Sequence, residues 1–277
     1  MHTKAANLTR EQAYRFERTE NSGWEEFYRY ATPEAVQECG IEIENLANAT
    51  VTIASRIDML AVNRIIDTGL ETDFSEESLE RAISLYRSRN IPRFFLTLPP
   101  ISSPPDIPRW LGARKLYHYN NWVKMYRRAE PTVSQGGAIT ISQIGVSDAE
   151  LFAEILVNSF DWSRQLLGWI ASTVGKPGWY HYIAYDKLTP VAGALLFRKD
   201  DIGWLSFAAT LPQHRGKGAQ SALITRRIND AAELGCRWVT VETAEETAEK
   251  GVPSYRNLRR FGFDVAYLRP NYIFKME

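Results

Sequence analysis

The sequence is poor in cysteine. Its 277 residues contain two, Cys39 and Cys236, which lie far apart and outside any CxxC pattern or cluster of cysteine and histidine. A disulfide framework or a structural zinc site needs several such residues at short spacings, so the sequence indicates neither. Both cysteines are expected to be buried thiols.

The chain also lacks a net charge and a long apolar run. The 33 Lys and Arg residues balance the 33 Asp and Glu residues, so no overall field exists to hold a nucleic-acid backbone or an anionic membrane. No stretch approaches the roughly 18 apolar residues of a membrane span, and the first residues have no signal-peptide core. We therefore expect a cytoplasmic protein with neither nucleic acid nor membrane as a partner.

What the chain does contain is the composition of a folded protein. Hydrophobic residues make up 44% and charged residues 24%, and the length suits one large domain or two smaller ones. The clearest boundary is the polar segment 130–137, which carries Pro131 and the pair Gly136 and Gly137. It predicts two domains, 1–130 and 131–277.

The two halves resemble each other when one is shifted by about 145 residues. This shift places Leu79, Ile83 and Asn90 on Ile224, Ile228 and Gly235, Phe94 and Leu96 on Val239 and Val241, and Ile107 on Val252. Each half then closes in the same way, with a helix that ends at glycine and two strands rich in tyrosine. The common order of these features predicts a duplication.

Hydrophobic periodicity outlines the first part of the second half. Alternation predicts a strand over 138–144, and Ser147 with Glu150 forms the pattern of a capping box that opens a helix through Phe160. A second helix is predicted over 163–174. Three strands should follow as an antiparallel meander, over 179–186, 192–198 and 203–210.

The rest of this half alternates helix and strand. Apolar residues at Leu223, Ile224 and Ile228 follow helical spacing until Gly235, and a strand follows over 238–243. A strand, helix, strand crossover makes 203–210 and 238–243 parallel neighbours. A short helix over 255–260 and two strands, 265–268 and 272–275, should close the chain.

The segment that indicates chemistry lies between the strand ending at Thr210 and the following helix. Gly216 and Gly218 allow a tight turn that aims backbone N–H groups at one point, and the helix start adds its positive dipole end. Arg215 and Lys217 add charge suited to a pyrophosphate. A basic loop exposed to solvent is the alternative. The Walker pattern fails because Gly218 follows Lys217, and the dinucleotide pattern lacks its third glycine.

With this motif the sequence resembles the GNAT superfamily of N-acetyltransferases. The family loop has Arg or Gln, two residues, Gly, one residue, then Gly or Ala, and the run from Arg215 matches all but the last position, Gln220. The run from Gln213 matches fully in a shifted register. The strand 239–243, the helix start 253–257 and the closing Gly262–Phe263 are similar to the family as well, so the resemblance covers about residues 138–274.

The resemblance implies an α+β fold of two tandem GNAT-like lobes, each a mostly antiparallel sheet with a central splayed parallel pair and flanking helices. It implies acetyl-CoA as co-substrate. The implied CoA-binding residues are those of the strand end, the glycine turn and the last helix: Ala208, Ala209, Thr210, Arg215, Gly216, Lys217, Gly218, Ala219, Ser254 and Asn257. Ser254 and Asn257 can equally serve as helix caps.

The residues for catalysis are fewer. Glu242, at the end of a splayed strand, is the candidate base or substrate contact, with local pairing as the alternative. The family's usual tyrosine acid is replaced by Leu258. Tyr255 lies one helical turn earlier and is the substitute candidate, although packing on the sheet also accounts for it. His181 is expected at the surface.

The first half has no counterpart of the glycine turn. Its predicted strand 59–68 leads into Glu71, Asp73, Glu76 and Glu77, whose charges would repel a pyrophosphate, so this lobe should not bind CoA. The resemblance thus implies a direct N-acetyltransferase for an amine of a small molecule or a protein. The alternative is a catalytically silent CoA-binding sensor or interaction module.

Overall fold

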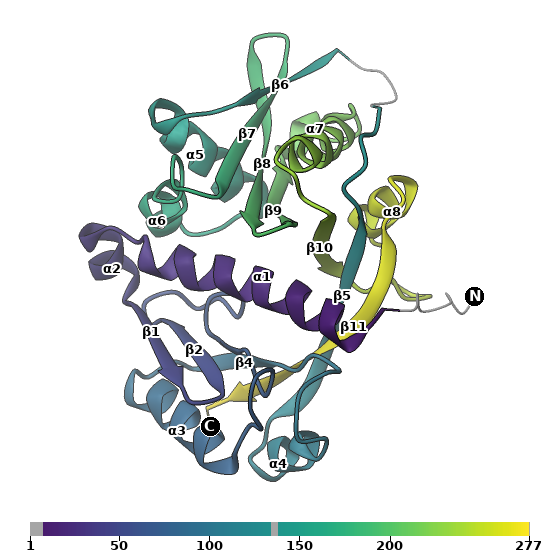
Figure 1. Ribbon diagram of the computed structural model, residues 1–277. Coiled ribbons are helices and arrows are strands. Elements are labelled where there is room, and N and C mark those ends of the chain that lie inside the picture. Colours follow the sequence, from purple (N-terminus) through teal and green to yellow (C-terminus); the bar gives the residue numbers. More distant parts are fainter. Residues whose placement is uncertain (1–7, 134–137, 277) are drawn as a thin grey trace. The chain divides into compact units, whose positions relative to one another are not determined.

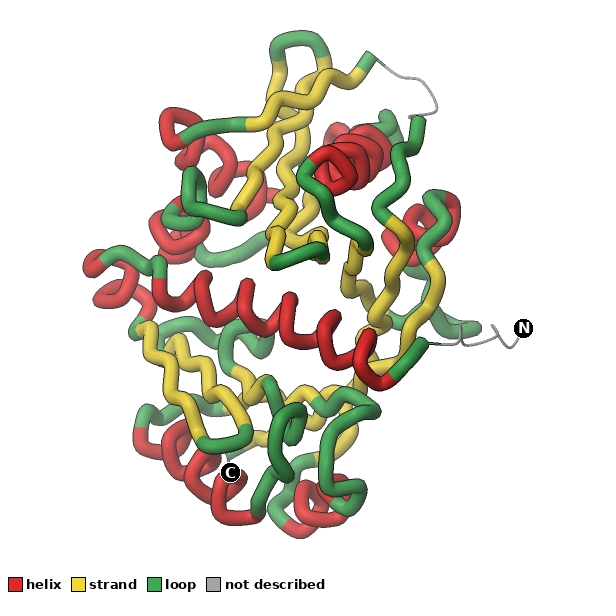
Figure 2. The backbone as a smooth tube through the Cα atoms, in the orientation of Figure 1, coloured by secondary structure: helices red, strands yellow, loops and turns green. Residues whose placement is uncertain are grey.

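The computed structural model describes residues 8–133 and 138–276, which form two units of mixed helix and sheet (Figures 1 and 2). Unit 1 comprises Met1–Arg29, Pro33–Lys124 and Val265–Glu277, and unit 2 comprises Tyr30–Thr32 and Met125–Asp264. The two units are thus divided differently from the expected boundary at residue 130. The last residues of the chain belong to unit 1.

Unit 1 contains a mixed sheet in the order β1-β2-β3-β4-β11-β5. Its pairs are antiparallel between β1, β2 and β3, parallel between β3 and β4, and antiparallel between β4 and β11. The elements are α1 (Arg10–Arg29), α2 (Pro33–Cys39), β1 (Ile41–Leu46), β2 (Ala49–Ala54), β3 (Arg64–Ile66), α3 (Glu76–Ser88), β4 (Arg93–Thr97), α4 (Ile107–Ala113), β5 (Tyr117–Arg128) and β11 (Asp264–Lys275).

Unit 2 has the strand order β5-β10-β9-β8-β7-β6, in which the final residues of β5 form the first strand. The strands from β6 to β9 are antiparallel neighbours, and β9 and β10 are parallel. The elements are β6 (Ile139–Gln143), α5 (Ala149–Phe160), α6 (Leu167–Ala171), β7 (Trp179–Asp186), β8 (Thr189–Lys199), β9 (Ile202–Thr210), α7 (Ala219–Glu233), β10 (Trp238–Ala244) and α8 (Pro253–Arg260). The predicted meander and crossover are confirmed.

Helices α5 and α7 cover opposite faces of the unit 2 sheet (Figure 1). A Cβ added at Gly193 would meet Phe152 of α5, whereas one added at Gly203 would meet Ala231 of α7. Because side chains alternate along a strand, each residue of β8, β9 and β10 can be assigned to one of these faces from the pairing register. We call them the α5 face and the α7 face.

The two halves of the sequence repeat the same order of elements, from α1 to β5 and from α5 to β11. Helix α3 buries Leu79 and Ile83 as α7 buries Ile224 and Ile228. Both helices are followed by a left-handed residue, Asn90 with a φ of 56° and Gly235 with a φ of 79°. Asparagine and glycine are the residues that tolerate this conformation best, so the aligned positions meet the same backbone requirement.

Several predicted boundaries are wrong. The strand predicted over 59–68 is confined to β3, because Asp67 turns left-handed with a φ of 59°. The capping box does not form, since Asp148 is the N-cap of α5 and receives a hydrogen bond from Ser147 Oγ. The helix predicted over 163–174 is a short 3-10 turn followed by α6.

The closing strands were also predicted wrongly. Residues 265–268 and 272–275 belong to one strand, β11, and the corresponding residues of the first half form one strand, β5. The chain continues through Pro270 because its carbonyl accepts a hydrogen bond from Leu98 N at 3.0 Å. Gly112 lies inside α4, and Lys115 takes the left-handed conformation after it.

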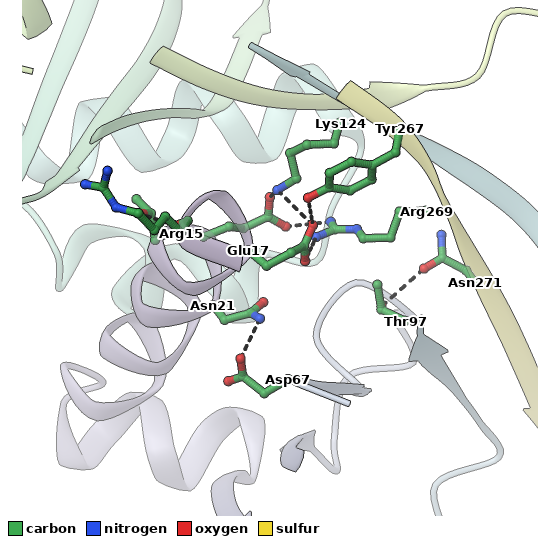
Figure 3. A network of polar contacts seen from close by, with 11 residues as sticks. Arg15, Glu17, Asn21, Asp67, Thr97, Lys124, Tyr267, Arg269 and Asn271 are labelled. Atoms are coloured by element: carbon green, nitrogen blue, oxygen red, sulfur yellow. Dashed lines mark hydrogen bonds and ion pairs between the residues drawn. The ribbon is translucent and has the colours of Figure 1, made fainter. Parts of the chain in front are cut away.

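A cluster of buried charges joins the first helix and the last strand of unit 1 (Figure 3). Arg269 of β11 donates to Glu17 at 2.8 Å and to Glu20 at 2.6 Å, and Lys124 of β5 pairs with Glu20. All four side chains are at most 1% exposed. We call these four residues the charge cluster.

The charge cluster sets the ionisation of Glu20. Burial alone would raise the pKa of this carboxyl, but the charges of Arg269, Lys124 and the nearby Arg64 lower it to about 2. Arg64 is itself buried, which lowers its pKa to about 10, and its guanidinium lies over the ring of Trp24 at 4.0 Å. Glu17 and Glu20 thus give α1 a buried polar face that depends on β11.

Both cysteines are buried free thiols, as expected, and burial raises the pKa of each to about 11. Among the helices of the described residues, none combines the length and apolar character needed to cross a membrane.

Candidate functional site

Strands β9 and β10 part within unit 2. Their parallel pairing runs from Ile202 and Trp238 to Leu205 and Val241. Beyond that pair β9 continues to Thr210 and β10 to Ala244. The predicted splay is therefore confirmed, since the two strands no longer pair with each other beyond Leu205 and Val241.

A bulge in β9 marks the start of the splay. The pairing of β8 with β9 passes from Leu195↔Ser206 to Gly193↔Ala209, so β9 contains one extra residue. Phe207 within it has a φ of 44°, which is left-handed. This backbone conformation is energetically costly for a residue with a bulky side chain. Strained residues of this kind cluster at functional sites.

Arg227 of α7 supports this bulge, and sequence reasoning missed it. Its Nη1 donates to the carbonyls of Leu195 at 3.1 Å and Ser206 at 3.4 Å. The side chain is buried, which lowers the pKa of the guanidinium to about 10. The available signal was its position on the apolar face of the helix, four residues after Leu223.

The glycine turn after β9 has the predicted geometry. Gly216 and Gly218 are left-handed, with φ values of 79° and 89°, and Gly218 is the N-cap of α7 without a side-chain cap. A Cβ added at either glycine would meet no atom of the described residues within 4 Å. The first N–H groups of α7 therefore lie at an open turn and have no side-chain cap. This arrangement is typical of anion-binding sites.

Side chains next to the turn hold it in place through hydrogen bonds to neighbouring residues. Arg215 Nε donates to the Thr210 carbonyl at 3.3 Å and Arg215 Nη2 to the Ser159 carbonyl at 3.2 Å. Gln220, at the position that departs from the family pattern, donates to Thr210 Oγ1 at 3.1 Å. Lys217 Nζ lies 3.8 Å from Asp186 and is half exposed. Lys217 is therefore an exposed cation beside the Asp186 carboxylate, whereas Arg215 holds the backbone.

The remaining candidates of the CoA set lie on both sides of this turn. Ala208 is half-buried, and Ala209, Thr210 and Ala219 are buried. On α8, Ser254 Oγ is 2.6 Å from Thr243 Oγ1, and Asn257 accepts a hydrogen bond from Arg260. Ser254 thus ties α8 to the splayed end of β10.

Glu242 lies on β10 directly after the last residue paired with β9, and it is half-buried. Val239 pairs with Gly203, which faces α7, so Val241 and Thr243 share the α7 face. Glu242 therefore lies on the α5 face, at the point where the strands part.

Tyr255 and Leu258 lie one turn apart on α8. Leu258 is buried at 4% exposure, so the position of the family's tyrosine is filled by a core residue. Tyr255 is half-buried. Leu258 therefore contributes to the packing of α8.

The expectation that His181 lies at the surface is wrong. It is 1% exposed, its Nε2 lies 3.1 Å from Thr173 Oγ1, and its ring packs against Phe152 with centroids 4.9 Å apart. Burial lowers the pKa of the imidazole to about 3, so the ring is neutral. Strand alternation placed it correctly on one face but could not reveal that α5 covers that face.

In unit 1 the loop between β3 and α3 corresponds to the glycine turn, and it is packed. Ser75 caps α3 by accepting a hydrogen bond from Ser78 N, so the helix start already has a partner. A Cβ added at Gly69 would lie 2.2 Å from the Ser103 carbonyl, which shows that the loop is packed. Asp73 accepts a hydrogen bond from Ser103, and Glu71 from Tyr14. Ser75 thus occupies a donor of the α3 start, and the loop is packed against Ser103 at Gly69, unlike the open glycine turn of unit 2.

No group of three or more His, Cys, Asp or Glu residues in ranges 8–133 and 138–276 is arranged to hold a metal ion.

Comparisons with known proteins agree with the topology. Residues 149–263 match the model of the acetyltransferase (GNAT) family. No curated protein matched the sequence.

Solved structures share the fold at low sequence identity. A GCN5-related N-acetyltransferase from Kribbella flavida has a TM-score of 0.65 and 12% identity, with 96% of each chain covered. One from Sphaerobacter thermophilus has a TM-score of 0.59 and 15% identity, with 84% of this chain and 82% of that chain covered. A tandem GNAT protein from the clavulanic acid biosynthesis pathway has a TM-score of 0.56 and 12% identity, covering 82% and 78%. Residues 149–263 thus match the acetyltransferase (GNAT) family, and the chain shares its fold with these solved structures.

Proposed function

We propose that the protein transfers an acetyl group from acetyl-CoA directly to an amine of a small molecule or a protein, and that unit 2 is the catalytic unit. The observation that supports this most strongly is the open glycine turn at the start of α7, at the end of a strand that has parted from its parallel neighbour. The left-handed Gly216 and Gly218 and the exposed Lys217 fit a pyrophosphate there. Ala208, Ala209 and Thr210 would pair with the pantetheine arm through their backbone.

In the proposed reaction Glu242 takes the proton of the incoming ammonium, directly or through water. The amine nitrogen then forms a bond to the thioester carbon, the carbon–sulfur bond breaks, and the leaving thiolate takes up, directly or through water, the proton that the nitrogen loses as the amide forms. A backbone N–H at the β9 bulge would stabilise the negative charge on the carbonyl oxygen. A thiol has an ordinary pKa of about 8.5, so its departure needs little help from an acid. Leu258 at the usual acid position is therefore compatible with turnover.

The loss of that acid also favours a second candidate, a silent CoA-binding sensor or interaction module. Both candidates need the glycine turn. They differ in turnover, which is measured as free thiol released from acetyl-CoA in the presence of a set of amines. Thiol release that depends on an amine supports the enzyme, and binding without release supports the sensor.

Replacing Gly218 tests the binding site. Acetyl-CoA should raise the melting temperature of the native protein by mass action, and Gly218→Val should abolish this shift because its side chain fills the open space before α7. Asparagine tolerates a positive φ better than valine does, so Gly218→Asn should fold well and still lose most of the shift.

Gly235→Val is the matched control for Gly218→Val. Gly235 lies after the other end of α7 with a φ of 79° and also has open space around its Cβ position. It should cost similar backbone strain but keep the shift. A full shift in a folded Gly218→Asn protein would place acetyl-CoA elsewhere.

Calorimetry should give one acetyl-CoA per chain. The loop of unit 1 is packed against Ser103, its helix is capped by Ser75, and its carboxylates oppose an anion. Two equivalent sites would contradict this proposal. So would a loss of binding in a folded variant in which Glu71 and Asp73 are neutralised.

A further inference from the structure

Three aromatic side chains of unit 2 lie together beside the bulge of β9. The rings of Phe160, at the end of α5, and Trp162 are stacked with centroids 4.4 Å apart and an interplanar angle of 21°. The ring of Phe207 meets Trp162 edge to face at 6.2 Å. Phe160 is 41% exposed, and the other two are half-buried. We call these three residues the aromatic patch.

The aromatic patch is attached to the candidate site at two points. Ser159, which precedes Phe160, is held through its carbonyl by Arg215 at the base of the glycine turn. Phe207 is the left-handed residue of the bulge and directly precedes Ala208. Both attachments are within unit 2, so the patch borders the splayed end of β9.

Glu242 lies on the same face of the sheet as the patch. The pairing register places Glu242 on the α5 face, and Trp162 belongs to the segment that follows α5. A carboxylate and aromatic rings thus share one face next to the opening between β9 and β10. Aromatic ring faces and a carboxylate both attract an ammonium group, and rings also stack on flat apolar groups.

Core packing alone does not account for the patch. A single exposed apolar residue is ordinary, but here the exposed ring of Phe160 is stacked on a second ring, and a third is held at a strained backbone position. A subsite for a small polar amine would instead present hydrogen-bonding groups around the ammonium.

We propose that the aromatic patch is the acceptor subsite, and that the acceptor is a primary amine carried on an aromatic or similarly flat apolar group. This inference rests on the proposed acetyltransferase function. The apolar group stacks against Trp162 and Phe160, and the amino group extends toward Glu242 and the splay.

Binding is tested first, because it does not require turnover. 2-Phenylethylamine is titrated by calorimetry into the protein saturated with CoA, with ethanolamine as the polar comparison. We expect 2-phenylethylamine to bind and Trp162→Ala to weaken its binding by at least about tenfold, as for a lost apolar contact in a binding pocket. Trp162→Phe should retain most of the affinity because it keeps a ring. Val146→Ala is the control, since Val146 is another exposed apolar residue of unit 2, at 71% exposure.

Steady-state kinetics provide the second readout. Trp162→Ala should lower kcat/KM for 2-phenylethylamine by at least about tenfold and leave that for ethanolamine within about twofold. Equal losses for both amines, or a wild-type protein that acetylates ethanolamine and not 2-phenylethylamine, would overturn the acceptor inference and leave the proposed function intact. If acetyl-CoA gives no thermal shift in the wild-type protein, the proposed function itself fails.

Discussion

Glu242→Gln is expected to lower kcat for acetyl transfer by about 10²- to 10⁴-fold, the range typical of a lost general base, while acetyl-CoA affinity is retained. Glutamine has a similar shape but cannot accept the proton of the ammonium. Part of the loss should be recovered at higher pH, where more of the acceptor is already a free amine. The measurement is a pH profile of kcat for the variant and the wild-type protein.

Two control variants sharpen this test. Glu249→Gln changes an exposed carboxylate in the loop after β10 and should leave the profile unchanged. Tyr255→Phe should cost little, because a thiolate leaves readily without an acid. If Glu242→Gln weakens folding and leaves turnover per folded molecule intact, Glu242 is a structural residue and the base lies elsewhere.

Arg269→Ala is expected to destabilise unit 1 by about 3–5 kcal/mol, the usual cost of removing one partner from a buried ion pair. The variant leaves Glu17 and Glu20 with Lys124 as the cation in direct contact, and Glu17 also keeps the hydrogen bond from the Tyr267 hydroxyl. Urea denaturation should show a large fall in the midpoint. The stabilisation from Glu20 is complete above about pH 4.5 and is lost as the pH falls toward its folded pKa of about 2.

The control is Arg109→Ala, which removes an exposed ion pair with Asp106 at 3.2 Å in the same unit. Exposed pairs contribute about 0–1 kcal/mol, so its midpoint should barely move. Similar effects of the two variants would show that the charge cluster contributes no more than a surface pair.

The sequence predicted unit 2 better than unit 1, and the reason is the kind of contact in each. Strand β7 and the start of the α7–β10 crossover depend on local alternation and on glycines, which are visible in a short window. Helix α1 was not predicted, because Glu17 and Glu20 interrupt the apolar side of the helix between Phe16 and Trp24. The partners that allow this, Arg269 and Lys124, are more than 100 residues away along the chain.

The candidate site was predicted in part. The glycine turn could be recognised because left-handed residues at a helix start are nearly always glycine, as at Gly218. The bulge at Phe207 could not, since its backbone conformation depends on the register of β8 against β9. The burial of His181 was also missed, because the packing of α5 decides which face of strand β7 is covered, and this packing is not visible in the sequence.

The assignment of β11 to unit 1 has a consequence for synthesis of the chain. Domains usually fold in order as they emerge from the ribosome, the amino-terminal one first. Here the sheet of unit 1 needs residues 265–275, which are made after unit 2, and until then β4 lacks the neighbour that pairs with residues 93–97. Glu17 and Glu20 of α1 also lack their ion pairs with Arg269 until that residue has been made. Unit 1 can therefore complete its folding only after the whole of unit 2 has been translated, even though most of unit 1 precedes unit 2 in the sequence.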